Sequence, residues 1–262
     1  MGKASDYPYF SEPVTAFAHR GGWIDPGEEQ RENTLFAFQR AVDLGYDYLE
    51  TDVRVTADGV LVAFHDADLA RISGSARTLG DLTYEELKQH PLNGTDVVPT
   101  MAELFEAFPQ TNFNIDIKES RAVEPLLDVI RAYGADKRVC VASFSHGRIR
   151  AFRRLAGTRV ATGVSTLGVS WNVALPWLPR LFNSPGQAFQ VPAAQVVRGF
   201  TVPVVTPRLI KTAHALDKRV HVWTINEEDE MHRLLDQGVD GLISDRIDIL
   251  ANVLRDRGVG SF

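Results

Sequence analysis

The stretch Tyr48–Asp66, with the sequence YLETDVRVTADGVLVAFHD, decides the fold. It contains two extended runs joined at Asp58-Gly59, a dipeptide that favours a tight turn between two strands. Because side chains alternate between the two faces of a strand, Glu50 and Asp52 point the same way. The second run ends at His65. Two carboxylates that repel each other, with a histidine at a neighbouring strand end, indicate a metal site or an acid–base site rather than a hydrophobic core.

The composition of the 262-residue chain is that of a globular protein, with 44% hydrophobic and 24% charged residues. Its length would allow two domains, but an α/β barrel of this size is routinely a single domain. The net charge of −6 disfavours a non-specific nucleic-acid binder, which is usually basic, and gives no general attraction to anionic membranes. We therefore expect one domain over residues 1–262 and no nucleic-acid partner.

Targeting and redox signals are sparse. The N-terminus MGKASDYPYF has no apolar segment of the kind found in a secretory signal, and no run of about 18 apolar residues could span a membrane. The single cysteine, Cys140, excludes an intramolecular disulfide and is expected in the core, since free cysteine behaves as a small hydrophobe. These features predict a cytoplasmic protein without a transmembrane segment.

Short Val- and Ile-rich runs alternate with helical stretches along the whole chain. The predicted strands are residues 14–18, 46–53, 113–118, 138–142, 159–164, 188–191, 219–224 and 241–244. The predicted helices are residues 33–44, 100–108, 123–133, 148–155, 207–216, 227–237 and 247–257. Such alternation predicts a parallel sheet with crossover helices, and eight strands at this length favour a closed (β/α)₈ TIM barrel. The alternative is a doubly wound open sheet, but the first loop carries His19-Arg-Gly-Gly22 instead of G-x-G-x-x-G.

Two segments interrupt this alternation. Residues 66–99 follow the strand hairpin and predict a small insertion over the barrel mouth. Residues 165–187 are apolar and punctuated by prolines. This second segment has two interpretations: a loop helix packed on the barrel, or a lid or apolar wall that makes a peripheral contact with lipid, because exposed apolar patches tend to mark binding surfaces.

Polar side chains collect where the predicted strands end, and in a parallel barrel that end carries the active site. They are His19, Arg20, Glu50, Asp52, His65, Asp116, Lys118, Ser143, Trp223, Ser244 and Asp245. Each has a structural explanation by itself, such as a hydrogen-bonded histidine or a carboxylate paired with a cation. Glu32, before Asn33, has the chemistry of a helix start. The fold alone would not require all of these polar groups at the same end of the barrel.

The combination describes phosphodiester cleavage. Three carboxylates form an oxygen-rich site suited to a hard divalent cation, Mg²⁺ or Ca²⁺; they are Glu50, Asp52 and Asp116. Arg20 and Lys118 can bind a phosphate. Two histidines, His19 and His65, can act as general base and general acid. The cation would polarise a phosphoryl oxygen and offset developing charge.

Four short motifs resemble the glycerophosphodiester phosphodiesterase family. His19-Arg-Gly, Glu32-Asn33-Thr34, Glu50-Thr-Asp52 and His65-Asp66 are similar to its H-R, E-N, E-x-D and H-D signature. Later motifs are also similar to those of the family; they are Asn114-Ile-Asp-Ile-Lys118, Ser143-Phe144, Val222-Trp-Thr-Ile-Asn226 and Gly238–Arg246. The resemblance covers about residues 14–252, and the early signature is its specific part.

The resemblance implies a TIM barrel with a small insertion after the H-D motif, and metal-dependent hydrolysis of glycerophosphodiesters to an alcohol and glycerol 3-phosphate. It implies the following roles: metal ligands Glu50, Asp52 and Asp116; acid–base pair His19 and His65; phosphate ligands Arg20 and Lys118; a supporting role for Glu32; and a glycerol pocket lined by Trp223.

Two positions depart from the family pattern. The family usually has Glu where this chain has Asp116. Since the side chain is one methylene shorter, its contact with a cation could run through water, and alternation turns the neighbouring Glu119 away. Ile247 stands where the family usually has Pro, a change expected to affect only the entry of the last helix.

Two rival functions remain open at this stage. The first is lysophospholipase-D-like cleavage or intramolecular phosphotransfer on lysophospholipids, which the apolar 165–187 segment favours. The second is a non-catalytic barrel that binds phosphorylated ligands, against which the intact histidine pair argues. The sequence does not specify the leaving alcohol, the preferred cation, the nucleophile or the oligomeric state.

Overall fold

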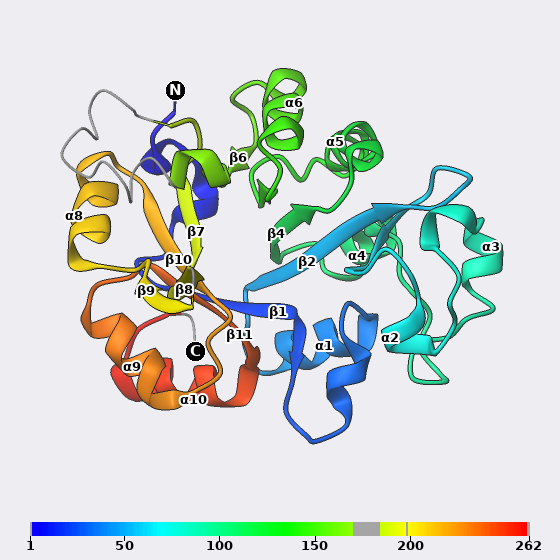
Figure 1. The fold of residues 1–262 in the computed structure, drawn as a ribbon, viewed down its shortest axis with the longest axis horizontal. Helices are drawn as coiled ribbons and strands as arrows, with labels where there is room; N and C mark the ends of the chain where they lie inside the picture. Colours follow the sequence, from blue (N-terminus) through cyan, green and yellow to red (C-terminus); the bar gives the residue numbers. More distant parts are fainter. Residues whose placement is uncertain (1, 170–183, 198, 261–262) are drawn as a thin grey trace.

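The computed structural model describes residues 2–169, 184–197 and 199–260, and its centre is a barrel of parallel strands (Figure 1). The barrel strands are β1 (Thr15–Trp23), β2 (Tyr48–Val55), β4 (Asn112–Ile117), β5 (Val139–Ala142), β6 (Ala161–Thr162), β7 (Ala188–Pro192), β10 (Arg219–Trp223) and β11 (Gly241–Arg246). They are hydrogen-bonded in the order β6-β5-β4-β2-β1-β11-β10-β7. A parallel bridge between Gly163 and Ala188 joins the two ends. The barrel is therefore closed, which confirms the predicted fold and excludes the open sheet.

Helices surround the barrel, one after nearly every strand (Figure 1). They are α1 (Leu35–Asp43), α4 (Met101–Ala107), α5 (Val123–Ala132), α6 (His146–Ala156), α8 (Pro207–Ala215), α9 (Glu228–Asp236) and α10 (Ile247–Arg257), with further helical residues at 166–169. Threonine hydroxyl groups cap the N-termini of several of these helices. Thr34, Thr100 and Thr206 each accept a backbone N–H bond from the residue three positions later. All seven predicted helices are thus confirmed.

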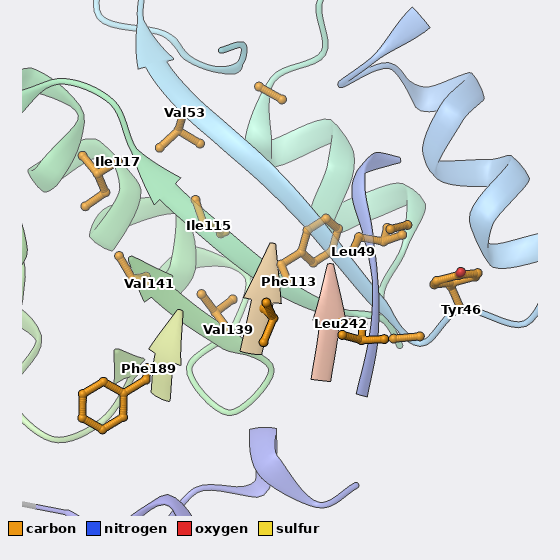
Figure 2. Close-up of a cluster of buried hydrophobic side chains, with 14 of the residues drawn as sticks. Tyr46, Leu49, Val53, Phe113, Ile115, Ile117, Val139, Val141, Phe189 and Leu242 are labelled. Atoms are coloured by element: carbon orange, nitrogen blue, oxygen red, sulfur yellow. The ribbon is translucent and has the colours of Figure 1, made fainter. Parts of the chain in front are cut away.

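Strand alternation divides the side chains between core and site. Figure 2 shows side chains of the core that come from the strands, together with Tyr46, which precedes β2. The labelled strand residues are Leu49, Val53, Phe113, Ile115, Ile117, Val139, Val141, Phe189 and Leu242. On β4, Ile115 and Ile117 are fully buried in this layer. Their neighbours Asn114 and Asp116 have the opposite orientation and line the central pocket.

The amino-terminal end of the barrel is closed by two short 3-10 turns, η1 (Ala4–Asp6) and η2 (Pro8–Phe10). Tyr9 stacks edge-to-face on Phe10 and Tyr48, with ring centroids 5.0 and 5.3 Å apart. Cys140 is buried in the same cluster, where it was expected. This plug leaves the opposite end as the open one.

The segment after β2 forms the predicted hairpin and a small satellite. β3 (Leu61–Ala63) pairs antiparallel with β2, and Gly59 supplies the positive φ of 88° that the turn needs. Three short helical elements follow: α2 (Ala70–Ser73), η4 (Leu79–Asp81) and α3 (Tyr84–Leu87). They share an apolar cluster of their own that includes Leu69, Leu79 and Leu87. The satellite lies beyond the carboxyl end of β2 (Figure 1).

Other elements differ from the predictions or were missed by them. The strand predicted at 159–164 is only the two-residue β6; Gln187 Oε1 accepts from the Thr162 backbone N–H, and Arg153 donates to the Gly163 carbonyl just after it. A hairpin of β8 (Ala194–Val197) and β9 (Phe200–Pro203) lies between the strand predicted at 188–191 and the helix predicted at 207–216, where no element was predicted. Two short 3-10 turns, η3 (Glu28–Arg31) and η5 (Ser120–Ala122), complete the list.

The two interpretations of residues 165–187 fall mostly on 170–183, outside the described residues. Within the described part of the chain, no helix is long and apolar enough to cross a membrane.

Candidate active site

A pocket of about 340 Å³ opens at the carboxyl ends of the barrel strands. Eight of the nine predicted site residues line it: His19, Arg20, Glu50, Asp52, His65, Asp116, Lys118 and Trp223. The ninth, Glu32, lies behind Arg20, whose Nη1 donates to both of its carboxylate oxygens at 3.2 and 3.3 Å. The structure therefore brings together residues that are far apart in the sequence.

Parallel register explains why these side chains meet. In the β1–β2 pair His19 lies opposite Glu50, and in the β2–β4 pair Asp52 lies opposite Asp116. Side chains at matched positions of adjacent parallel strands share one face. The predicted metal ligands and one predicted acid–base residue consequently form adjacent rungs inside the barrel.

His19 is fixed by a carboxylate from the last strand. Its Nδ1 lies 2.5 Å from Asp245 Oδ1, and Asn226 Nδ2 donates to the other oxygen of Asp245 at 2.9 Å. Nε2 lies 3.8 Å from Glu50 Oε2. Burial alone would lower the pKa of His19, but the negative charges of Glu50 and Asp245 outweigh it and raise that pKa.

Like His19, His65 contacts a carboxylate through Nδ1, but its pKa is shifted in the opposite direction. Its Nδ1 lies 2.7 Å from Asp66 Oδ1. Burial and the nearby cations Arg20 and Lys118 outweigh Asp52 and lower the pKa of His65. In both histidines Nδ1 faces a carboxylate, which favours the tautomer that carries its proton on Nδ1.

Asp52 stands between two cations. Lys118 Nζ lies 2.8 Å from its Oδ1, and Arg20 Nε lies 2.9 Å from its Oδ2. The Arg20 contact is a close ion pair without hydrogen-bond geometry, since neither of its two atoms has a hydrogen-bond partner among the described residues. Burial opposes ionisation of Asp52, but Lys118 and Arg20 overcome it and lower its pKa.

The pKa values of the other two carboxylates are shifted upward. Burial, followed by repulsion from Asp52, raises the pKa of Glu50 to about 7. Burial also raises the pKa of Asp116, although Lys118 Nζ lies 2.7 Å from its Oδ2. Asp116 Oδ1 is buried and has no hydrogen-bond partner within the described residues. Crowded, incompletely partnered carboxylates of this kind favour an added cation.

The donor chemistry fits a hard divalent ion, because three carboxylates and no thiolate converge from β2 and β4. In the described ranges, however, no group of three or more histidine, cysteine, aspartate or glutamate side chains is placed to hold a metal ion. The Lys118 ammonium occupies the space between Asp52 and Asp116. A cation bound by Asp52 and Asp116 would therefore compete with Lys118 for their carboxylate oxygens.

Sequence patterns indicated no role for three residues of the site. Asp245 and Asn226 lie in the later motifs, but their pairing with His19 was not expected. Arg71, from α2, donates to Glu32 at 2.6 and 3.0 Å and to Asp66 Oδ2 at 2.7 Å. No local pattern marks Arg71, since its partners are brought to it only by the fold.

The opposite wall of the pocket is apolar. It is formed by Ala142, Phe144, Val164, Val169, Val191, Pro192, Val204, Trp223 and Ile243. The rings of Phe144 and Trp223 meet edge-to-face with centroids 5.5 Å apart, and Phe144 also lies 5.5 Å from Lys118 Nζ. Trp223, predicted in a glycerol pocket, thus lies at the boundary between the charged and apolar walls.

Comparisons with known proteins identify the family of the chain. A family model described as the glycerophosphoryl diester phosphodiesterase family matches residues 19–249. A Mycobacterium tuberculosis protein named "Probable glycerophosphodiester phosphodiesterase 2" is 39% identical over 231 residues, covering 86% of each chain. Rat "Lysophospholipase D GDPD1" is 28% identical, covering 87% of this chain and 82% of its own.

A solved structure from Silicibacter pomeroyi, described by the same family name, superposes with a TM-score of 0.79. It is 24% identical and covers 98% of this chain and 100% of its own, which supports the barrel fold. Members of the family generally depend on a divalent cation. The chain belongs to the glycerophosphoryl diester phosphodiesterase family, as the sequence motifs predicted, and is a phosphoric diester hydrolase.

Proposed function

We propose that the chain hydrolyses glycerophosphodiesters to an alcohol and glycerol 3-phosphate, with His19 and His65 as the acid–base pair. One observation carries this proposal. Two histidines, each bonded through Nδ1 to a carboxylate, line the same pocket as Arg20 and Lys118. Paired proton-transfer groups beside phosphate-binding cations are the parts that phosphodiester hydrolysis needs.

Arg20 and Lys118 orient the phosphate in this proposal. Each is held by Asp52 and still faces the pocket. Arg20 is fixed on its other side by Glu32, so its guanidinium is positioned before substrate arrives. In this proposal Glu32 supports the site without lining it.

Charge balance supports dependence on a cation. Glu50, Asp52 and Asp116 supply three carboxylates, against two cationic side chains from Arg20 and Lys118. One excess negative charge remains when all five are ionised, and that charge would repel a phosphodiester. We infer that Glu50, Asp52 and Asp116 hold Mg²⁺ or Ca²⁺, which when bound polarises the phosphoryl oxygens and offsets developing charge.

The two histidines move protons at defined atoms. Nε2 of one histidine accepts a proton from the attacking hydroxyl, and Nε2 of the other donates a proton to the leaving alkoxide. Asp245 and Asp66 orient the two rings through Nδ1. The apolar contact between Phe144 and Trp223 bounds the side of the pocket expected to receive glycerol.

A substrate panel tests the function. Purified protein is incubated with glycerophosphocholine, glycerophosphoethanolamine and glycerophosphoglycerol, with EDTA and then with added Mg²⁺ or Ca²⁺. We expect release of glycerol 3-phosphate that EDTA abolishes and one of the two cations restores. Absence of turnover with every substrate and both cations would refute the proposal.

The relative named as a lysophospholipase D keeps lysophospholipid cleavage as a second candidate. Intramolecular attack by a glycerol hydroxyl would produce a cyclic phosphate, which phosphorus NMR distinguishes from a hydrolysis product. We also propose that residues 1–262 fold as one domain in the cytoplasm; limited proteolysis and cell fractionation test these two expectations.

A further inference from the structure

A hydrogen bond crosses the interior of the barrel at the bottom of the pocket. Gln190 Nε2, on β7, donates to Asn114 Oδ1, on β4, at 2.7 Å. The two strands are not neighbours in the barrel, since β5 and β6 lie between them. Both side chains line the pocket. The bond therefore spans the interior and forms part of the pocket floor.

The cluster that closes the barrel beneath this bond is apolar. Cys140, which lies beside Asn114 in the β4–β5 register, is buried in this cluster with Phe17. Its Sγ lies 4.0 Å from Gln190 Nε2. Trp223, expected in the glycerol pocket, packs against the same cluster. A substrate that enters between the two walls of the pocket consequently ends at the Asn114–Gln190 pair.

Hydrogen-bonding capacity remains open on both amides. Each amide side chain has two donor hydrogens and a carbonyl oxygen, and the bond between them uses only one donor and one acceptor. Asn114 Nδ2 and Gln190 Oε1 make no hydrogen bond to any residue in the described ranges. Neither atom is among the buried polar atoms that are closed off without a partner. The pair therefore offers an open donor and an open acceptor, and reversing both amides would only exchange the two roles.

A purely structural bond would not need this arrangement. Buried polar groups in folded proteins are normally paired, and two apolar side chains would fill the same space without open donors or acceptors. Asn114 is only 3% exposed and lines the pocket, so its free N–H group reaches water through that pocket. An open donor beside an open acceptor matches a hydroxyl group, which accepts and donates, better than it matches a charged group.

The depth of the floor selects which hydroxyl group can reach it. Asn114 precedes Asp116 by two residues on the inward face of β4, so it lies about 7 Å deeper in the barrel. Lys118 Nζ, which is bonded to Asp116, marks the level of the phosphate in the proposed function. The three-carbon chain of glycerol covers a comparable distance, so its far end would meet the Asn114–Gln190 pair. The leaving alcohol would then extend toward the open mouth.

We propose that Asn114 and Gln190 form the specificity site for the terminal hydroxyl of the glycerol half of the substrate, which is the hydroxyl farthest from the phosphate. This inference rests on the proposed function and adds two residues that select its substrate. Asn114 Nδ2 donates to the hydroxyl oxygen, and the hydroxyl donates to Gln190 Oε1. No covalent bond of the substrate changes there, so the pair acts through binding and orientation.

A substrate that lacks this hydroxyl tests the proposal. kcat/KM is measured, with the cation that supports turnover, for glycerophosphocholine and for the 1-phosphocholine ester of propane-1,2-diol, which keeps the middle hydroxyl and lacks the terminal one. We expect the wild-type kcat/KM to be about 10²- to 10⁴-fold lower for the propanediol ester, because both amides then remain unpaired. Equal kcat/KM values for the two substrates would overturn the proposal.

Two variants test the residues independently. Gln190→Met and Asn114→Leu each remove one amide and nearly keep the side-chain volume. Each should lower kcat/KM more for glycerophosphocholine than for the propanediol ester, so that the preference falls about ten- to hundredfold. Gln39→Met, at an exposed position of α1, is the matched control and should keep the wild-type preference.

Circular dichroism verifies that each variant is folded, and the wild-type comparison of the two substrates stands without them. Equal losses on both substrates in the folded variants would contradict the proposal, because a structural defect does not distinguish the two substrates. Turnover of both substrates at equal rates would remove the hydroxyl site and leave the proposed function standing. Absence of turnover with every substrate would refute the proposed function, and the hydroxyl site with it.

Discussion

The two walls of one pocket are built on different principles. On the charged wall, Asp52 is buried between two cations and both histidines are bonded to carboxylates. On the apolar wall, Phe144 is 57% exposed and the β8–β9 hairpin extends into solvent. Groups that must act within a fraction of an ångström are held by mutual contacts. Apolar side chains that bound a pocket act through non-directional contacts and require no such precision.

Substitution of the histidines on the charged wall should give the largest loss of activity. His19→Gln and His65→Gln should each lower kcat by about 10²- to 10⁴-fold, because each removes a proton-transfer group. The measurement is steady-state turnover of glycerophosphocholine, with circular dichroism to verify folding. His232→Gln, on the exterior helix α9, is the matched control and should keep the wild-type rate. Near-normal rates in both site variants would contradict the assigned roles.

Asp116 tests whether the charged wall holds a cation. Asp116→Asn removes one of three carboxylates, so the Mg²⁺ concentration for half-maximal activity should rise by about ten- to hundredfold. Asp116→Glu restores the charge and should return most of the affinity. A titration of activity with Mg²⁺ after EDTA treatment measures both. An unchanged cation requirement in Asp116→Asn would exclude Asp116 as a ligand.

Arg71 tests whether the insertion organises the charged wall. It joins Asp66, the partner of His65, to Glu32, the partner of Arg20. Arg71→Met should lower kcat about tenfold, and Arg71→Lys should recover only part of it because one ammonium cannot bridge both carboxylates.

The pH profile separates positioning by Arg71 from a merely structural role. Burial would raise the pKa of Asp66, but His65 and Arg71 lower it. Without Arg71 that pKa should rise, so the acid limb of the rate profile should shift to higher pH. A uniform loss of rate with an unshifted acid limb would contradict the positioning role.

Titration of His221, which lies below both walls, should change the stability of the protein rather than its turnover. Burial lowers its pKa to about 4, whereas the unfolded side chain titrates near about 6.5. Between these values the unfolded state binds a proton that the folded state excludes. The free energy of unfolding should therefore fall by up to about 3 kcal/mol as pH drops from about 6.5 to about 4.

In the His221→Gln variant this part of the pH dependence should be absent. Urea denaturation at pH 7 and pH 5 measures the difference. An identical pH dependence in the wild type and the variant would show that His221 does not titrate as its burial requires.

Local sequence patterns predicted most of the charged wall. Alternation in residues 46–53 and 113–118 was enough to place Glu50, Asp52 and Asp116 on inward faces, because strand orientation is a property of neighbouring residues. The Asp58-Gly59 turn likewise placed His65 beside them. The roles of these residues remain proposals, but their convergence in one pocket is shown.

Contacts between distant segments were not predictable in the same way. His19 and Asp245 are separated by 226 positions and Arg71 and Glu32 by 39, so each pair depends on closure of the barrel or docking of the insertion. The β8–β9 hairpin was missed because its strands have four residues each and carry too little pattern to identify. The apolar wall was therefore the less predictable half of the pocket.

Phosphorus NMR of glycerophosphocholine with the wild-type protein and Mg²⁺ tests the central claim most directly. The account predicts that the phosphodiester resonance is replaced by that of glycerol 3-phosphate, and that His65→Gln under identical conditions leaves the phosphodiester intact. A wild-type sample with an unchanged phosphodiester resonance, or a His65→Gln sample that converts it at the wild-type rate, would contradict the account.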